Sequence, residues 1–326
     1  MIDREEIFSR YPWLKPNDNP ESVIMGDDLD SAISIVLYLH THPNAKLIGI
    51  YQNYSLIRYS DNFNWRDILN SVWIDLDIYH SDCRSLGHHI VQLRKDDRLP
   101  GFSSSCNLNE LVGRSFSNFR EKYPLGTIHF LMWLYDIEIP NIVNADLLIW
   151  LADSSYINGQ SEYWKFGSKR KGFRWNVRNW MNNEIPLDSN LSIFDEIDTI
   201  EFEKRMQHFQ QNIMEPRGFI QGKGQAASHH LELYGYQCQP SMEIKSHIKL
   251  LLEFVSEITG WVYSSSQVSD LKIFNQIMQG NRRRIDISEI RRVGLDNFIN
   301  EQNIFSFVFQ DSKTMNYTRN IGLHGE

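Results

Sequence analysis

Short apolar runs and amphipathic stretches follow one another along the first half of the chain. The runs at 22–26, 45–52 and 71–78 have the length and composition of mainly buried strands, whereas the apolar stripe at 29–40 is typical of a helix. Near-continuous apolar strands separated by helices indicate a parallel sheet with helices on both faces. We therefore predict an α/β fold for this part of the chain.

The second half has a different pattern. Residues 127–136 and 144–155 are predicted to form two buried helices, and from about residue 196 amphipathic helices and short strands indicate a smaller α+β domain. A chain of 326 residues is longer than a single hydrophobic core usually supports. We therefore expect more than one domain. The predicted segments are an α/β domain, a basic aromatic connector and the smaller α+β domain, at 1–160, 161–195 and 196–326.

Composition narrows the class of protein. The charged opening MIDREEIFSR and the lack of a run near ~18 apolar residues lead us to expect neither a signal peptide nor a membrane span. Three widely spaced cysteines suit a reducing compartment, so we expect a cytoplasmic protein without a membrane partner. The formal net charge of −8 weighs against nonspecific binding to nucleic acid but leaves room for local basic patches.

Acids and histidines gather near the predicted ends of strands, where ligands of open α/β sheets bind. Asp28 and Asp30 follow the first strand, and Asp75 lies near the end of another, soon followed by His88 and His89. Carboxylate and imidazole groups are ligands for divalent cations such as manganese. Each residue also has an ordinary alternative, because such acids cap helices and single histidines are often hydrogen-bonded parts of a core.

The order of these motifs over residues 22–155 resembles that of the DHH phosphoesterases. The family's Asp-x-Asp motif, strand-end aspartate, two histidines of Asp-His-His and fourth aspartate are matched in this order by Asp28 and Asp30, Asp75, His88 and His89, and Asp153. Two positions depart from the pattern. Gly87 stands where Asp-His-His has its acid, and Ile24 stands where many members have a histidine. A carboxylate that would orient an imidazole is therefore missing or comes from elsewhere.

The resemblance implies a two-metal phosphoesterase site. It implies two manganese ions, or magnesium, bound by Asp28, Asp30, Asp75, His88 and Asp153. Either Asp75 or Asp153 would bridge the ions. His89 and Asp153 would be the catalytic residues, with His89 contacting the phosphate while a metal-activated water attacks phosphorus.

Basic and aromatic residues are interleaved in the segment 164–180, WKFGSKRKGFRWNVRNW, which contains no acid. Cations can follow a phosphate backbone while aromatic rings stack on bases. The candidate substrate-binding residues are therefore Lys169, Arg170, Lys171, Arg174 and Trp175. The alternative is that the tryptophans pack in a core beneath solvated lysines. His229, in a second His-His pair, is a further candidate substrate contact, with an ordinary position in a strand as its alternative.

These features predict a hydrolase. We expect a metal-dependent phosphodiesterase that acts on short oligonucleotides, cyclic nucleotides or single-stranded ends. The alternative, favoured by Gly87 and Ile24, is a DHH-like nucleotide or nucleic-acid binding protein without activity. The expected partner is a nucleotide or single-stranded nucleic acid, and a homo-oligomer is compatible with the sequence.

Overall fold

Two compact units make up the chain, and each is assembled from separate stretches of sequence. The computed structural model describes residues 2–17, 19, 21–52, 55–165, 168–186, 196–217, 219, 243–268, 276–319 and 321. The sheet unit comprises Ile2–Gly26, Asn44–Tyr123 and Ser265–Glu326, and the helical unit comprises Asp27–Pro43 and Pro124–Ser264. The units therefore interleave along the chain, and the division into segments 1–160, 161–195 and 196–326 stays a prediction about independent folding.

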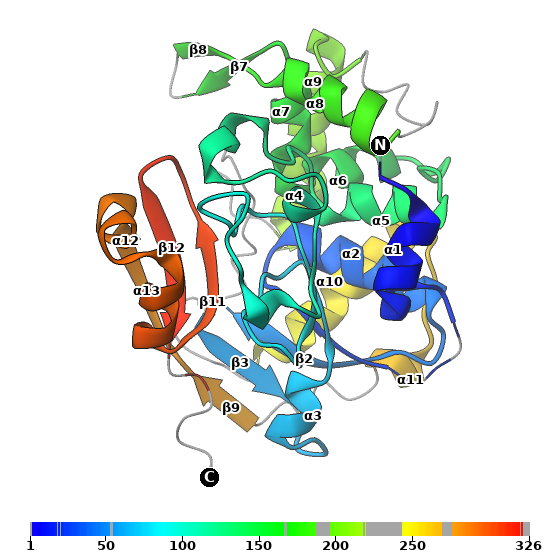
Figure 1. Cartoon of the computed structure of the whole chain (residues 1–326). Helices are drawn as coiled ribbons and strands as arrows, with labels where there is room; N and C mark the ends of the chain where they lie inside the picture. Colours follow the sequence, from blue (N-terminus) through cyan, green and yellow to red (C-terminus); the bar gives the residue numbers. More distant parts are fainter. Residues whose placement is uncertain are drawn as a thin grey trace. The chain divides into compact units, whose positions relative to one another are not determined.

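A seven-stranded sheet forms the centre of the sheet unit, in the order β6–β5–β4–β1–β2–β3–β9. The strands from β6 to β2 are parallel, whereas β3 and β9 extend the sheet in antiparallel pairing (Figure 1). In chain order the strands are Ser22–Met25 (β1), Lys46–Gln52 (β2), Leu56–Tyr59 (β3), Val72–Ile74 (β4), Arg84–Gly87 (β5), Cys106–Asn107 (β6) and Gln276–Gln279 (β9). This mostly parallel sheet with its helices confirms the predicted α/β class.

The order of the strands reverses around β1. From β1 the chain passes to β2 on one side, and it later returns to place β4 on the other side. Met25 of β1 is in register with Ile74 of β4, and Ile74 is in register with Leu86 of β5. The segments that follow these three strands therefore leave the sheet at the same edge, where open α/β sheets bind their ligands.

The predicted strand at 71–78 is shorter in the structure. β4 ends at Ile74 because Asp75 has a left-handed backbone conformation, with φ of 62°, which an extended strand does not contain. The predicted strands at 22–26 and 45–52 are confirmed as β1 and β2. The remaining helices of this part of the sheet unit are short, namely Arg4–Arg10 (α1), Trp65–Leu69 (α3), Leu108–Leu111 (α4) and Ser265–Val268 (α11).

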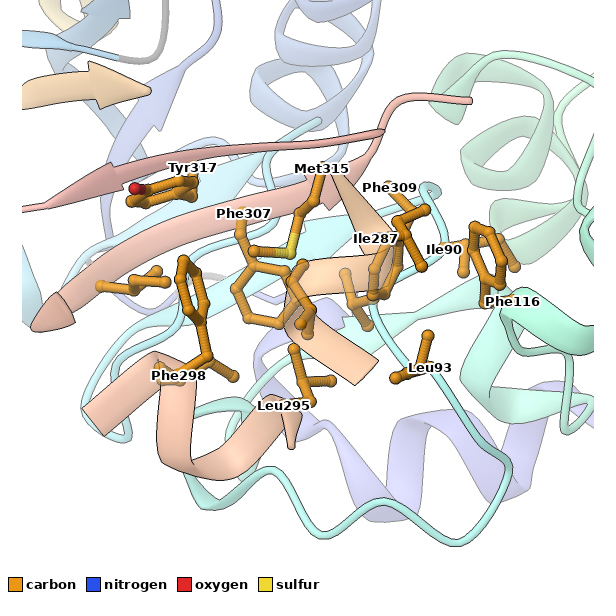
Figure 2. Close-up of a cluster of buried hydrophobic side chains, with 14 of the residues drawn as sticks. Ile90, Leu93, Phe116, Ile287, Leu295, Phe298, Phe307, Phe309, Met315 and Tyr317 are labelled. Atoms are coloured by element: carbon orange, nitrogen blue, oxygen red, sulfur yellow. The ribbon is translucent and has the colours of Figure 1, made fainter. Parts of the chain in front are cut away.

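A smaller antiparallel sheet lies in the same unit, in the order β10–β12–β11. Its strands and helices are Asn281–Asp286 (β10), Ile287–Val293 (α12), Leu295–Gln302 (α13), Ile304–Phe309 (β11) and Thr314–Arg319 (β12). Figure 2 shows Phe307, Met315 and Tyr317 of this sheet packed with Phe298 of α13, in a cluster that also includes Ile90 from the segment after β5. The predicted smaller α+β part thus shares a core with the first half of the chain.

The helical unit is built around α2, Leu29–Thr41. The Asp28 side chain caps this helix by accepting a hydrogen bond from Ser31 N at 2.9 Å, and every residue from Leu29 to Leu39 is buried. The other helices are Thr127–Tyr135 (α5), Ala145–Leu151 (α6), Ser155–Gly159 (α7), Arg174–Asn179 (α8), Ile200–His208 (α9) and Glu243–Thr259 (α10). α2 packs against α5, α6 and α10 (Figure 1).

The segment predicted as a connector has structure of its own within the helical unit. Glu162–Lys165 (β7) and Ser168–Lys171 (β8) pair as an antiparallel hairpin, and α8 follows directly. The predicted helices at 127–136 and 144–155 are confirmed as α5 and α6, the second of which ends at Leu151. Among the described residues, no helix has both the length and the apolar content needed to cross a bilayer.

Replacement of Phe307 by alanine is expected to lower the free energy of unfolding by ~3–5 kcal/mol, because its fully buried ring would leave a cavity in the cluster of Figure 2. Phe173, which is 42% exposed, offers a matched control, and Phe173→Ala should change the same quantity by less than ~0.5 kcal/mol. Denaturant unfolding measures both. Equal losses for the two variants would contradict the assigned core.

Candidate functional site

Two acid–histidine pairs lie side by side where β4 and β5 end. Asp75 Oδ1 is 3.2 Å from His88 Nδ1, and Asp77 Oδ2 is 2.9 Å from His89 Nδ1. The two imidazole rings are stacked, with centroids 4.4 Å apart and planes inclined by 23°. The parallel pairing of β4 with β5 brings the acids of one strand end to the histidines of the other. Of the predicted site residues, this part of the sheet unit therefore contains Asp75, His88 and His89.

Asp75 occupies a strained backbone position. Its φ of 62° lies in the left-handed region, which costs a residue with a side chain roughly 1–2 kcal/mol. Asp153, the fourth acid of the family pattern, has a φ of 47° in the 3₁₀ turn Ala152–Ser154 of the helical unit. Strain of this kind concentrates at functional sites, so both outliers favour a role for these acids beyond capping.

Asp77, two residues beyond Asp75, is a buried acid with hydrogen-bond partners of its own. Its carboxylate is buried, and Oδ1 accepts a hydrogen bond from Asn107 Nδ2 at 2.7 Å. Asn107 Nδ2 also donates to the backbone carbonyl of His89 at 2.9 Å, and Asn109 Nδ2 donates to that of His88 at 2.6 Å. The two asparagines, which sequence reasoning missed, thus fix the backbone of both histidines. The available signal was the Asn-Leu-Asn sequence at a strand end.

Asp30 has a structural role within the helical unit. Its Oδ2 accepts a hydrogen bond from Thr127 N at 2.5 Å and its Oδ1 accepts one from Ile128 N at 3.0 Å. These are first-turn N–H groups of α5, which have no partner within their own helix. A Cβ at Gly126 would lie 2.8 Å from the Asp30 carboxylate, so the glycine gives the acid room to reach the helix end. Asp30 therefore caps α5, whatever else it binds.

The carboxyl of Asp28, in the helical unit, has a strongly raised pKa. Burial raises the pKa of its carboxyl to about 8, and the negative charges of Asp153 and Asp30 contribute to the rise, while the hydrogen bond from Ser31 N opposes it. The three carboxyl groups thus interact within one electrostatic cluster. Such mutual repulsion between acids is typical of sites that hold cations or protons.

The basic aromatic segment divides into exposed and buried residues. Trp175 is 54% exposed, whereas Trp180 is fully buried. Only the first of these two rings is accessible for stacking on a base, and the second packs in a core. Lys171 is exposed, and Arg174 forms an ion pair with Asp198. Lys169 and Arg170 lie on β8, but their side chains are outside the described part of the chain. His229 also lies outside the described residues.

No protein-family model, curated protein or solved structure matches the chain. The chemical interpretation of the site therefore depends on the residues themselves and on the order of their motifs.

The variant Asp28→Asn is expected to be more stable than the wild-type protein in the absence of metal, and increasingly so as the pH rises. The wild-type carboxyl has a raised pKa in the folded state, so its contribution is fully present below about pH 3.8 and is lost as the pH rises to about 8. Each pH unit in this window adds at most about 1.4 kcal/mol to the difference. Urea unfolding in chelator from pH 4 to 9 measures it.

Asparagine preserves the cap of α2, because its side-chain oxygen can still accept from Ser31 N. Asp28→Ala is the control, since it removes both charge and cap and should lose about 1 kcal/mol relative to the asparagine variant at every pH. A difference between Asp28→Asn and wild type that stays constant from pH 4 to 9 would show that this carboxyl does not titrate as described.

Proposed function

We propose that this chain is a metal-dependent phosphodiesterase of the DHH type. The observation that carries the proposal is the pairing of Asp75 with His88 and of Asp77 with His89 at the carboxyl ends of two parallel strands. Buried acid–histidine pairs are uncommon in ordinary cores, because a buried charge is costly unless it is paired. They are frequent in sites that bind metals or transfer protons.

The donor chemistry fits a divalent cation. Asp75 and His88 of the sheet unit are buried and offer a carboxylate and an imidazole, and we propose that Asp30 is a further ligand of the same ion. Their carboxylate and imidazole donors suit manganese or magnesium, and they lack the thiolates that softer metals prefer. Chain connectivity supports the contribution of the first motif, because Met25 is in register with Ile74 and the chain reaches Asp28 three residues later. We propose that Asp28 and Asp153 complete the ligand set for a second ion.

A bound ion would supply Lewis acidity toward water and toward the phosphate. The chain's own residues would do the remaining work. Asp75 fixes the orientation of the His88 ring through Nδ1. His89, with 27% of its side chain exposed, is the accessible histidine of the pair and would contact a non-bridging oxygen of the phosphate. Its position is held from two sides, by Asp77 at the ring and by Asn107 at the backbone.

The proposed substrate is a nucleotide or a short single-stranded nucleic acid. Support comes from the basic aromatic segment, where Phe173 and Trp175 expose 42% and 54% of their surface next to the exposed Lys171. Exposed aromatic rings beside cations suit base stacking along a phosphate backbone. Arg174 contributes less to this proposal, because Asp198 already balances its charge.

His88→Ala should weaken manganese binding by about 10-fold or more, since loss of a metal ligand should cost at least as much as loss of the residues that orient ligands. His208 offers a control, because it is an exposed histidine on α9, and His208→Ala should leave the affinity unchanged. Titration calorimetry with manganese on the purified protein measures both. Equal losses for the two variants would count against His88 as a ligand.

Turnover should require the metal. The decisive assay offers the wild-type protein a dinucleotide, a single-stranded oligomer, a cyclic dinucleotide and pyrophosphate, each with manganese and with excess chelator. Hydrolysis of at least one phosphodiester in manganese alone is the expected result. Hydrolysis that persists in chelator would refute the metal mechanism. Manganese binding without any hydrolysis would instead favour the alternative of a binding protein.

Replacement of Lys169, Arg170 and Lys171 by glutamine should weaken binding of a single-stranded oligomer. The salt dependence should also become shallower, by roughly 0.7 in the logarithmic slope for each phosphate that a cation no longer neutralises. Turnover of a minimal dinucleotide should survive, because a dinucleotide is too short to depend on cations that follow a longer backbone. Fluorescence anisotropy at several salt concentrations measures the slope, and an unchanged slope would refute this role for the segment.

The tryptophans of the same segment provide a matched pair. Trp175→Ala should lose oligomer affinity, by ~1–3 kcal/mol if one base stacks on the ring, with little change in stability. Trp180→Ala should instead lower the free energy of unfolding by ~3–5 kcal/mol, because the ring is fully buried. The reverse assignment in binding and unfolding measurements would contradict the division of the segment into exposed and buried faces.

A further inference from the structure

Gly87 is a glycine for reasons of space. Its backbone lies outside the left-handed region, so the conformation alone would accept other residues. A Cβ at this position, however, would lie 1.9 Å from Asp77 Oδ1 and 2.4 Å from Asp77 Cγ. These distances are far below any real contact between such atoms. The carboxylate of Asp77 therefore fills the volume in which a side chain at position 87 would begin.

The carboxylate that fills this volume is directed at the neighbouring histidine. Asp77 Oδ2 is hydrogen-bonded to His89 Nδ1 at 2.9 Å, and the other oxygen accepts from Asn107 Nδ2 at 2.7 Å. Asp77 is 3% exposed, so both oxygens are held away from water. Within the described chain, His89 Nε2 has no hydrogen bond, and it lies at the end of the ring that points away from Asp77.

We propose that Asp77 is the positioning residue of His89, and that it supplies from the end of β4 the carboxylate that Asp-His-His would place at position 87. The inference rests on the proposed function, in which His89 contacts the substrate phosphate through Nε2. Asp77 fixes the rotation of the ring and holds the proton of the neutral imidazole on Nδ1, because a carboxylate can only accept. The departure at Gly87 is then a relocation of the acid to the adjacent strand.

Asn107 makes this arrangement testable by a single substitution. Its Oδ1 accepts from Asn109 N and Glu110 N as the cap of α4, so its amide nitrogen must face Asp77. In an Asp77→Asn variant, the new side-chain oxygen will remain toward that donor, because the backbone N–H that donates to the other oxygen, His89 N, is more distant at 3.4 Å. The new NH₂ group will then face His89 Nδ1. Nδ1 must then accept, which moves the ring proton to Nε2. The variant keeps the shape of the side chain at position 77 and changes the tautomer of the His89 ring.

The test is ¹⁵N NMR of the histidine side chains at a pH where both rings are neutral. In the wild-type protein, His89 should carry its proton on Nδ1, and in Asp77→Asn it should carry it on Nε2. His88 is the internal control, because its Nδ1 is held by Asp75 and should give the same signal in both proteins. A His89 tautomer that is unchanged by the substitution would overturn the proposal.

A double-mutant cycle tests the shared volume without reference to activity. Gly87→Ala should lower the melting temperature by roughly 5 °C or more in the wild-type background. It should cost far less in an Asp77→Ala background, because the carboxylate it would strike is gone. Equal costs in the two backgrounds would overturn the claim that Asp77 occupies the side-chain volume of position 87.

Metal-dependent turnover of the Asp77 variants is the last test of the positioning role. Asp77→Asn should reduce turnover by about 10–100-fold while manganese affinity stays within about twofold, as expected for a residue that acts through His89. The relocated variant Asp77→Gly with Gly87→Asp should recover part of the loss. Turnover that is unchanged in Asp77→Asn would overturn the positioning role. A wild-type protein without metal-dependent hydrolysis would refute the proposed function, whereas the tautomer and stability measurements would still decide the role of Asp77.

Discussion

The parallel pairing of β4 with β5 is the constraint on which the candidate site depends. Ile74 and Leu86 are in register, so the two strands end level with each other and the acids after one meet the histidines after the other. A slip of one residue would turn each side chain of the strand to the opposite face of the sheet. It would separate both acid–histidine pairs at once. The chemistry at this edge is therefore fixed by the hydrophobic pairing of the strands beneath it.

Buried carboxylates need hydrogen-bond or charged partners. Three buried acids of this chain differ in the partners that they have. The Asp77 carboxylate is stabilised by hydrogen bonds from an asparagine and a histidine, and that of Asp30 by hydrogen bonds from two backbone N–H groups at the start of α5. Burial raises the pKa of Asp28 to about 8, its acidic neighbours Asp153, Asp30 and Asp27 add to the rise, and a single backbone donor, Ser31 N, opposes it. Asp28 is therefore the carboxyl that holds a proton at neutral pH when no metal is bound, and a cation could take the place of that proton.

The sequence predicts the strands that carry the site better than the backbone conformation and side-chain partners within it. Apolar runs at 22–26 and 45–52 give β1 and β2 because buried parallel strands need continuous apolar residues. The end of β4 at Ile74 could not be predicted, since an aspartate in the left-handed region has no distinctive sequence. The burial of Asp77 could not be predicted either, because its partner Asn107 lies 30 residues away in the chain. β9 pairs with β3 across a far longer stretch of the chain, and local periodicity gives no sign of this pairing.

Composition could not predict which tryptophan of the basic aromatic segment is buried, whereas the positions of the residues around the helix explain it. Val177 and Trp180 are three residues apart, which places them on one face of α8 and its continuation, and both are fully buried. Trp175 precedes Val177 by two residues, a rotation of roughly 200° that turns it to the opposite face. Its exposure of 54% follows from this phase. The apolar face anchors the segment in the helical unit, and the same packing leaves the Trp175 ring in solvent.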